Sequence, residues 1–184
     1  VFPIMHGSFG EDGTVQGLLE LAGIPIVGCG TLSSAICMDK DIAHKLAARE
    51  GIAVPPSMTF ARKTDIVAIK TTAETLGYPV FVKPVKAGSS FGVSKVVDFS
   101  SLPAAVEEAF KYDKQIILEK AIEGFEVGCA VLGNDELTIG ELDEVELTRG
   151  FFDYREKYNL ITSKIHVPAR ISAKKASEVK QITS

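Results

Sequence analysis

The sequence contains no tryptophan and only three cysteines, Cys29, Cys37 and Cys129. Their odd number and the lack of any C-x-x-C spacing exclude a disulfide framework and a thiolate zinc site. Such sparse use of cysteine is typical of proteins in a reducing cytosol, and we therefore expect a cytoplasmic protein.

Positive charge is also scarce, because 20 Lys and Arg residues stand against 24 Asp and Glu residues, a formal net charge of −4. Without a global basic field, neither nucleic acid nor an anionic membrane surface is an expected partner. The longest stretch without charge, Leu21–Met38, contains Gly23, Pro25, Gly28 and Gly30, which argues against a membrane span. No signal peptide is visible.

What is present is an ordinary globular composition. The 184 residues, 46% apolar and 24% charged, fit one large domain or two small ones with a real core. The chain begins at Val1 without a methionine, inside an apolar run, and stops at Ser184 within an expected helix.

The first part of the chain predicts a strand, a helix and a second strand. Residues 1–5 and 24–28 are short apolar segments, as buried strands are. Thr14 is expected to cap the helix between them, and Gly23 to end it. This order suggests the end of a parallel α/β unit.

The middle of the chain predicts the order strand, helix, strand, loop, strand, helix, strand. The expected strands are residues 57–61, 79–85, 93–99 and 115–121, and the expected caps of this region's helices are Asp39, Thr64 and Ser101. Beyond it we expect an antiparallel pair at 125–133 and 136–147, a long loop at 148–162, and a last helix capped by Ser172.

A glycine-serine loop, Lys86–Gly92, is the first candidate site. Small residues let backbone N–H groups approach an anion closely, and the hydroxyls of Ser89 and Ser90 add donors. Lys83, inside the adjacent apolar strand, could neutralise phosphate charge. Lys40 stands just inside a helix start. The spacing is not that of a P-loop. The alternative is a plain hairpin turn, with Lys83 pointing outward into solvent.

Two further segments carry candidate ligand groups. Glu119-Lys120 closes an apolar strand and Glu126 follows; a carboxylate there could accept from ribose hydroxyls while the strand end binds an adenine edge. The loop 6–13 places a histidine and two carboxylates after an expected strand, where α/β ligand sites form. The alternatives are ordinary surface charges and a solvated turn. The acidic stretch 141–146 alternates with apolar residues, which favours a solvated strand face over a metal site.

Taken together, four segments resemble one family, the D-alanine–D-alanine ligases of the ATP-grasp fold. They are HGSFGEDGTVQG (His6–Gly17), FVKPVKAGSSFGVSKV (Phe81–Val96), LEKAIEGFE (Leu118–Glu126) and FFDYREKY (Phe151–Tyr158). The resemblance implies an α/β (α+β) ATP-grasp fold preceded by the end of a Rossmann-like N-terminal α/β domain. The implied parts are that N-terminal end at 1–28, a central subdomain at 29–120, and a truncated C-terminal subdomain at 121–184 with an omega loop at 148–162.

The resemblance also implies roles for individual residues. The implied ATP-binding residues are Lys40, Lys83, Ser90, Glu119, Lys120, Ala121, Ile122 and Glu126. In this set the lysines hold phosphates, residues 119–122 frame the adenine, and Glu126 binds the ribose. Catalytic roles fall to Ser89, Lys157 and Tyr158, whereas His6 and Glu11 line the D-alanine site. The family's Mg²⁺ ligands are expected beyond Ser184, so we expect this chain alone to be inactive.

The implied reaction joins two D-amino acids at the expense of ATP. The carboxylate of D-alanine attacks the γ-phosphate, and the amine of the second substrate then attacks the resulting acyl phosphate. Residues 156–171 resemble most the D-alanine–D-serine ligases of vancomycin-type resistance, which favours D-serine as second substrate. A housekeeping enzyme that uses D-alanine in peptidoglycan synthesis is the alternative, and a D-lactate ligase is disfavoured by the E-K-Y sequence. A homodimer is compatible with the resemblance.

Two other classes of protein remain as alternatives. Another ATP-grasp carboxylate–amine ligase would share the lysines and the adenine segment, but not the sequence H-G-x-x-G-E-D-G. A binding module without enzymatic activity predicts that no nucleotide binds.

Overall fold

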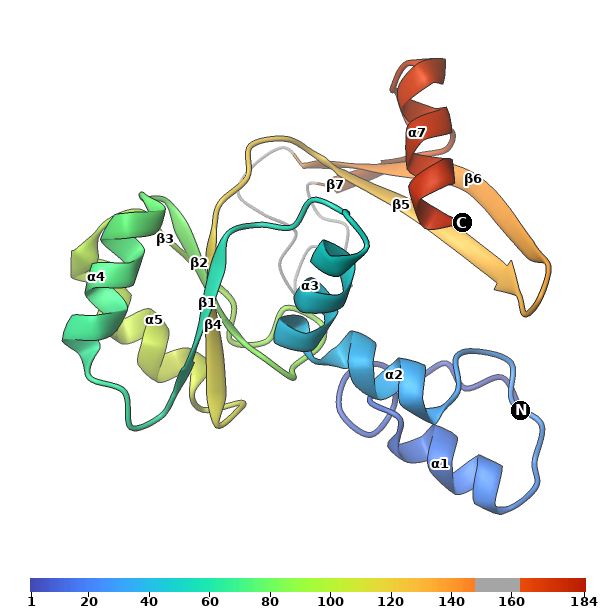
Figure 1. Ribbon diagram of the computed structural model, residues 1–184, viewed down its shortest axis with the longest axis horizontal. Coiled ribbons are helices and arrows are strands. Elements are labelled where there is room, and N and C mark those ends of the chain that lie inside the picture. Colours follow the sequence, from blue (N-terminus) through green and yellow to red (C-terminus); the bar gives the residue numbers. More distant parts are fainter. Residues whose placement is uncertain (148–162) are drawn as a thin grey trace. The chain divides into compact units, whose positions relative to one another are not determined.

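The computed structural model describes residues 1–147 and 163–184 of the chain (Figure 1). The chain divides into two compact units, Val1–Ile122 and Glu123–Ser184, and each is described by itself. The expected long loop at 148–162, with the catalytic candidates Lys157 and Tyr158, lies outside the described residues.

A four-stranded antiparallel sheet forms the centre of the first unit. Its strands are ordered β1-β4-β2-β3, and they span β1 Ser57–Ala61, β2 Val80–Pro84, β3 Ser94–Val96 and β4 Gln115–Lys120. Helix α4 (Ile66–Leu76) connects β1 to β2, and a short 3₁₀ turn, η1 (Phe99–Ser101), leads into α5 (Leu102–Ala109) before β4. The predicted order of strands and helices is therefore confirmed.

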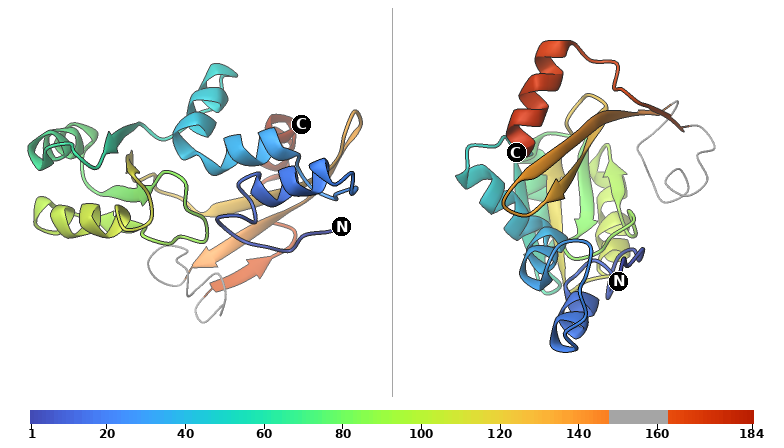
Figure 2. Two further views of the ribbon diagram at one scale, coloured as in Figure 1. Left: turned by 90° about the horizontal axis from the view of Figure 1, so that it is seen from below. Right: turned by 90° about the vertical axis from the view of Figure 1, so that its right-hand side faces the viewer.

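Alternation along the strands gives this sheet two different faces. Val80, Val82, Ile116 and Leu118 are fully buried on one face. Helices α4 and α5 lie side by side against that face, as the views in Figures 1 and 2 agree. Apolar side chains at every second strand position thus meet the apolar stripes of two helices, which is the layered solution expected for a sheet and helices around one core.

Helix α3 (Lys40–Arg49) lies against the other face of the sheet. Asp41 of α3 accepts a hydrogen bond of 3.0 Å from the hydroxyl of Thr59 in β1, and His44 lies 3.7 Å from the carboxylate of Glu119 in β4. Polar contacts therefore hold α3 in place, in contrast to the apolar packing of α4 and α5.

In the first unit, the helix caps confirm the prediction for Asp39 and correct those for Thr64 and Thr14. Asp39 caps α3 by accepting from the backbone N–H of Ile42, as expected. The cap of α4 is Asp65 rather than Thr64, because the Asp65 carboxylate accepts from the N–H of Val67. Thr14 is the first residue of its helix and not its cap, since the residue at the cap position is Gly13.

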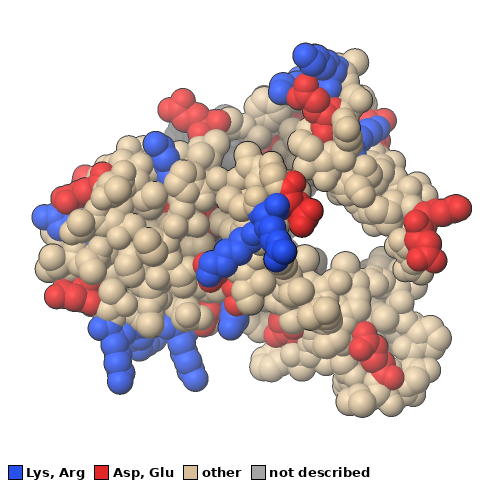
Figure 3. Space-filling model, in the orientation of Figure 1, with Lys and Arg blue, Asp and Glu red and all other residues tan. Residues whose placement is uncertain are grey.

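The N-terminal segment of this unit contains α1 (Thr14–Leu21) and α2 (Thr31–Met38). The strands expected at residues 1–5 and 24–28 are not formed, because no described strand lies beside them to complete a ladder. Two hydrogen bonds link them, from Val1 to Pro25 and from Val27 to Val1. Figure 3 shows this segment mostly in tan, the colour of uncharged residues, because residues 1–38 contain only three charged side chains. Several of its large apolar side chains are exposed.

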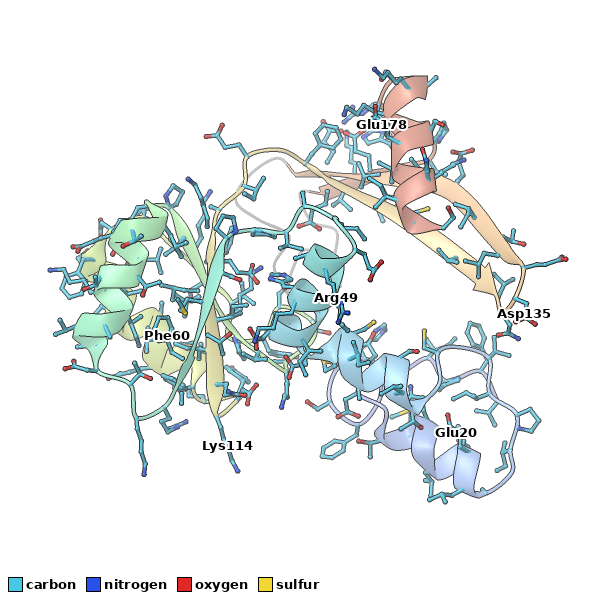
Figure 4. The ribbon with its side chains drawn as sticks, in the orientation of Figure 1. Glu20, Arg49, Phe60, Lys114, Asp135 and Glu178 are labelled. Atoms are coloured by element: carbon cyan, nitrogen blue, oxygen red, sulfur yellow. The ribbon has the colours of Figure 1, made fainter. Side chains whose placement is uncertain are left out.

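The second unit is a three-stranded antiparallel sheet with one helix. Strands β5 (Glu126–Gly133) and β6 (Leu137–Leu147) form the expected hairpin, with Asp135 at its tip (Figure 4). Strand β7 (Ser163–His166), which the sequence did not predict, pairs with β6. Helix α7 (Ala173–Thr183) is capped by Ser172, as expected.

Candidate functional site

Lys83 lies on the face of the four-stranded sheet that α4 and α5 leave uncovered. Its amine forms an ion pair with the carboxylate of Glu119, a side chain that is only 4% exposed. The amine also lies 5.3 Å from the centre of the Phe81 ring. Lys83 therefore does not point freely outward, and the interpretation of Lys83 as a plain surface lysine is wrong.

Glu119 keeps unused hydrogen-bonding capacity. One of its carboxylate oxygens, Oε1, is buried and accepts no hydrogen bond from the described residues, with His44 Nε2 at 3.7 Å. The other ring nitrogen of His44, Nδ1, is buried and equally without a described partner. Buried polar atoms normally find partners, so this cluster of Lys83, Glu119 and His44 has the character of a ligand-binding surface.

His44 is a site residue that the sequence interpretation missed. It follows Lys40 by four positions in α3 and therefore shares its side of the helix. That spacing was the signal available in the sequence.

Lys40 anchors the glycine-serine loop to the start of α3. Its side-chain amine donates to the carbonyl of Ala87 at 2.8 Å, and its backbone N–H donates to the carbonyl of Val85 at 3.2 Å. The Lys86 amine lies 3.4 Å from the carboxylate of the cap residue Asp39. Two lysines thus flank the entry to the loop at which the sequence predicts an anion site.

The loop itself is tightly turned. Ser89 and Ser90 have φ angles of 51° and 59°, in the left-handed region that few residues other than glycine adopt. Gly92 follows with φ 66°, and a Cβ there would lie 2.5 Å from the ring of Tyr112. The loop therefore needs glycine at position 92, and both serines are partly exposed on it.

The loop His6–Gly13 packs directly on the glycine-serine loop. A Cβ added to Gly88 would lie 2.9 Å from the Cα of Gly7 and 3.4 Å from the carboxylate of Glu11. Glu11 in turn accepts from the N–H of Gly7. Two segments about 80 residues apart in the sequence, each singled out as a candidate site, therefore meet at one place in the first unit.

Asp12 holds the His6–Gly13 loop in shape. Burial alone raises the pKa of its carboxyl, but hydrogen bonds from Phe9 and Thr14 outweigh burial and lower the pKa overall. The carboxylate stays ionised and holds the backbone of its own loop.

The end of β4 carries backbone groups that two prolines leave unpaired. The N–H of Lys120 donates to the carbonyl of Pro56 at 2.9 Å, and the N–H of Ala121 donates to the carbonyl of Pro79 at 3.1 Å. Proline has no N–H, so neither bond has the reciprocal partner that an antiparallel ladder normally provides. The sequence interpretation missed this role of the prolines, although Pro56 stands directly before one predicted strand and Pro79 begins the next.

Three of the remaining predicted site residues lie outside the first unit or outside the described residues. Glu126 begins β5 in the second unit, and Lys157 and Tyr158 lie outside the described residues. Ile122, the last residue of the first unit, is 65% exposed.

The acidic strand of the second unit is not entirely a solvated face. Glu141 is exposed, as expected, but Glu144 is buried, because Arg170 holds it with its guanidinium at 2.6 Å and its backbone N–H at 2.8 Å. These hydrogen bonds lower the pKa of Glu144 to about 2. His166 and Arg170 both contact Glu146, so the cluster satisfies itself and is structural.

No described group of three or more His, Cys, Asp or Glu side chains could hold a metal ion. In the same residues, none of the helices has the length and apolar character needed to cross a membrane.

Comparison with known proteins gives consistent matches over both units. A family model described as D-ala D-ala ligase C-terminus matches residues 46–184, and one described as D-ala D-ala ligase N-terminus matches residues 1–29. The chain is 45% identical to the vancomycin C-type resistance protein VanC1 of Enterococcus gallinarum, over 98% of this chain and 53% of that protein. It is 49% identical to a D-alanine–D-alanine ligase of Caldicellulosiruptor bescii, over 99% of this chain and 51% of that protein.

Among solved structures, the VanG D-Ala:D-Ser ligase of Enterococcus faecalis matches with a TM-score of 0.89 and 57% identity, over 100% of this chain and 53% of that one. The D-alanine-D-alanine ligase of Coxiella burnetii matches with a TM-score of 0.84 and 31% identity, over 100% of this chain and 48% of that one. The chain thus spans about half the length of the relatives it matches.

Proposed function

The chain belongs to the D-alanine–D-alanine ligase family and has its ATP-grasp fold, and we propose that it is the nucleotide-binding part of an enzyme joining D-alanine to a second D-amino acid. The observation that carries the proposal is the meeting of the His6–Gly13 loop with the glycine-serine loop, with Lys40 at its base. A substrate carboxylate and an ATP γ-phosphate have to come together at one such place.

The two lysines and the glycine-serine loop bind the phosphates in this proposal. Lys40 and Lys83 bring positive charge to the sheet face and the loop entry, and Ser90 adds a hydroxyl donor. Such groups act by positioning and charge neutralisation, which is most of what phosphoryl transfer requires from a protein. Mg²⁺ would neutralise further phosphate charge when bound, and we expect its ligands beyond Ser184.

The adenine lies at the end of β4 in this proposal, with Glu119, Lys120, Ala121 and Ile122 around it and Glu126 on the ribose. Support comes from the buried, unpartnered Oε1 of Glu119 and from the backbone groups that Pro56 and Pro79 leave without donors. The proposed parts of the chain remain 1–28, 29–120 and 121–184.

The proposed chemistry has two steps. The D-alanine carboxylate oxygen attacks the γ-phosphorus, the bond to the ADP oxygen breaks, and D-alanyl phosphate forms. The amine of the second substrate then attacks the carbonyl carbon, loses a proton, and expels phosphate. His6 and Glu11 line the D-alanine site, while Ser89, Lys157 and Tyr158 orient the substrate and the transferred group. A cover over the site protects the acyl phosphate from water.

D-Serine is the second substrate that we propose. The sequence of residues 156–171 and the 57% identity to the VanG D-Ala:D-Ser ligase support it. The corresponding role is glycopeptide resistance through altered peptidoglycan precursors, made in the cytoplasm. A housekeeping ligase that uses D-alanine twice is the second candidate, because a ligase of that name is 49% identical to this chain.

The test is ADP release in a polypeptide that continues through the expected Mg²⁺ ligands. With ATP, Mg²⁺ and D-alanine, we expect release to rise several-fold on adding D-serine, and to fall by at least tenfold in Lys83→Met. Lys45→Met, on the exposed side of α3, is the matched control and should leave the rate unchanged. A clear preference for D-alanine would refute the D-serine assignment, and no nucleotide binding at all would refute the ligase. The chain 1–184 alone should release no ADP in response to D-alanine.

A further inference from the structure

Pro56 stands at a defined position opposite the end of β4. Strands β1 and β4 are antiparallel with Ser57 opposite Glu119, and the same register places Pro56 opposite Lys120. The N–H of Lys120 donates to the carbonyl of Pro56 at 2.9 Å, which identifies this pair as one that would normally exchange two hydrogen bonds. The second bond would run from the N–H of residue 56 to the carbonyl of Lys120.

Proline cannot make that second bond, because its nitrogen carries no hydrogen. No backbone N–H elsewhere in residues 1–147 and 163–184 takes its place as a donor to the Lys120 carbonyl. Pro56 itself is exposed, so its ring is not needed to fill a core. What the proline contributes at this position is the absence of a donor.

The direction of the Lys120 carbonyl matches the edge of a purine base. In an extended chain, the backbone groups of residue i and residue i+2 point to the same side. The Lys120 carbonyl and the Ile122 N–H therefore form an acceptor and a donor on one edge. Adenine presents an amino donor beside a ring-nitrogen acceptor on its pairing edge, which is the complementary pattern.

We propose that Pro56 is a specificity-determining positioning residue that keeps the Lys120 carbonyl available to the amino group of adenine. The inference rests on the proposed use of ATP by this chain. A residue with an N–H at position 56 would close the ladder pair and compete with the nucleotide for the same carbonyl. One neutral hydrogen bond corresponds to about a fivefold difference in affinity.

The test compares two nucleotides that differ at one group. Dissociation constants for ATP and for purine riboside triphosphate, which lacks the amino group, are measured by calorimetry in the full polypeptide. We expect the unmodified protein to bind ATP about fivefold more tightly, and Pro56→Ala to reduce this ratio to about one. Pro55→Ala is the matched control, since the register directs an N–H at position 55 away from β4, and it should keep the ratio.

The outcomes separate the inference from the proposed function. Failure of the unmodified protein to bind ATP refutes the proposed function and this inference with it. ATP binding with an unchanged ratio in Pro56→Ala, or with equal weakening of both nucleotides, overturns the inference alone, because a merely structural role would affect both nucleotides alike. Hydrogen exchange gives a measurement without ligand: the backbone amide that Pro56→Ala introduces should be protected, and rapid exchange there would also overturn the proposal.

Discussion

The two sheets of this protein differ in how deeply their residues are buried. The four-stranded sheet has one face sealed by α4 and α5 and another that holds the buried carboxylate of Glu119 beside Lys83. In the described part of the three-stranded sheet, Leu142 and Val145 are buried, but much of β5 is exposed. Packing therefore supports the first sheet, whereas the second depends more on its ladder and on the Glu144–Arg170 cluster.

The largest expected difference comes from removing a core side chain. Leu118→Ala removes a fully buried side chain of β4 and should lower the free energy of unfolding by about 3 kcal/mol. Leu132→Ala, in β5 at 69% exposure, should change it by less than about 0.5 kcal/mol. Urea unfolding followed by circular dichroism measures both, and equal losses would contradict the comparison.

The next effect concerns the charged face of the first sheet. Lys83→Met leaves the Glu119 carboxylate buried without its cation and should cost about 2 kcal/mol, a value reduced because the Lys83 side chain is 24% exposed. Lys45→Met breaks an exposed pair with Asp41 and should cost less than about 0.5 kcal/mol. If Lys83→Met lowered the free energy of unfolding by no more than Lys45→Met does, burial of the Glu119 carboxylate would not depend on Lys83. Adding Glu119→Leu to Lys83→Met should restore most of the loss.

The helix caps provide a smaller contrast between the units. Asp39 is buried, accepts from Ile42, and lies near the Lys86 amine, so Asp39→Ala should cost about 1.5 kcal/mol. Ser172 caps α7 through a single bond from Lys175 at 3.3 Å, so Ser172→Ala should cost about 0.5 kcal/mol. Thermal unfolding of the two variants measures the difference, and the reverse order would argue against tighter packing of the first unit.

The smallest effect is confined to acidic pH and to the second unit. Since the hydrogen bonds of Arg170 hold the pKa of Glu144 at about 2, against an ordinary value of 4.5, folding favours its ionised form. This stabilisation is complete above about pH 5 and is lost as the pH falls toward about 2. Between these two pH values, the backbone amides of β5 and β6 should lose protection from hydrogen exchange, and Glu144→Gln should make that loss smaller. Hydrogen exchange measures this protection segment by segment. An equal change in β2 and β4 would contradict the attribution of the pH dependence to Glu144 and Arg170.

Much of the first sheet could be predicted from the sequence because its strands are short, apolar and bounded by turn residues. The strands expected at 1–5 and 24–28 have the same local character and do not form, since a strand also needs a neighbour to pair with. Thr64 was a reasonable cap, but the adjacent Asp65 offers a carboxylate in a better position. Strand β7 has only four residues in a polar region, too few for a periodic signal.

The candidate site was less accessible to sequence reasoning. Alternation could not decide the orientation of Lys83, because both faces of β2 carry apolar residues: Phe81 shares the face of Lys83, and Val82 lies on the opposite face. The partner that settles it, Glu119, lies 36 residues away in the chain. The approach of Gly88 to Gly7 likewise depends on tertiary structure, and only the resemblance of the two loops to one family connected them in advance.

The left-handed conformations of Ser89 and Ser90 set stability and function against each other. A residue with a Cβ in this conformation is disfavoured by about 1 kcal/mol relative to glycine. Selection for thermal stability alone would be expected to replace both serines by glycine, and a screen for hardier variants should recover those changes early. Glycine should be enriched at positions 89 and 90 in such a screen. It should be depleted at both positions when cell growth depends on the activity of the ligase, and the two results together would show the trade-off at individual residues.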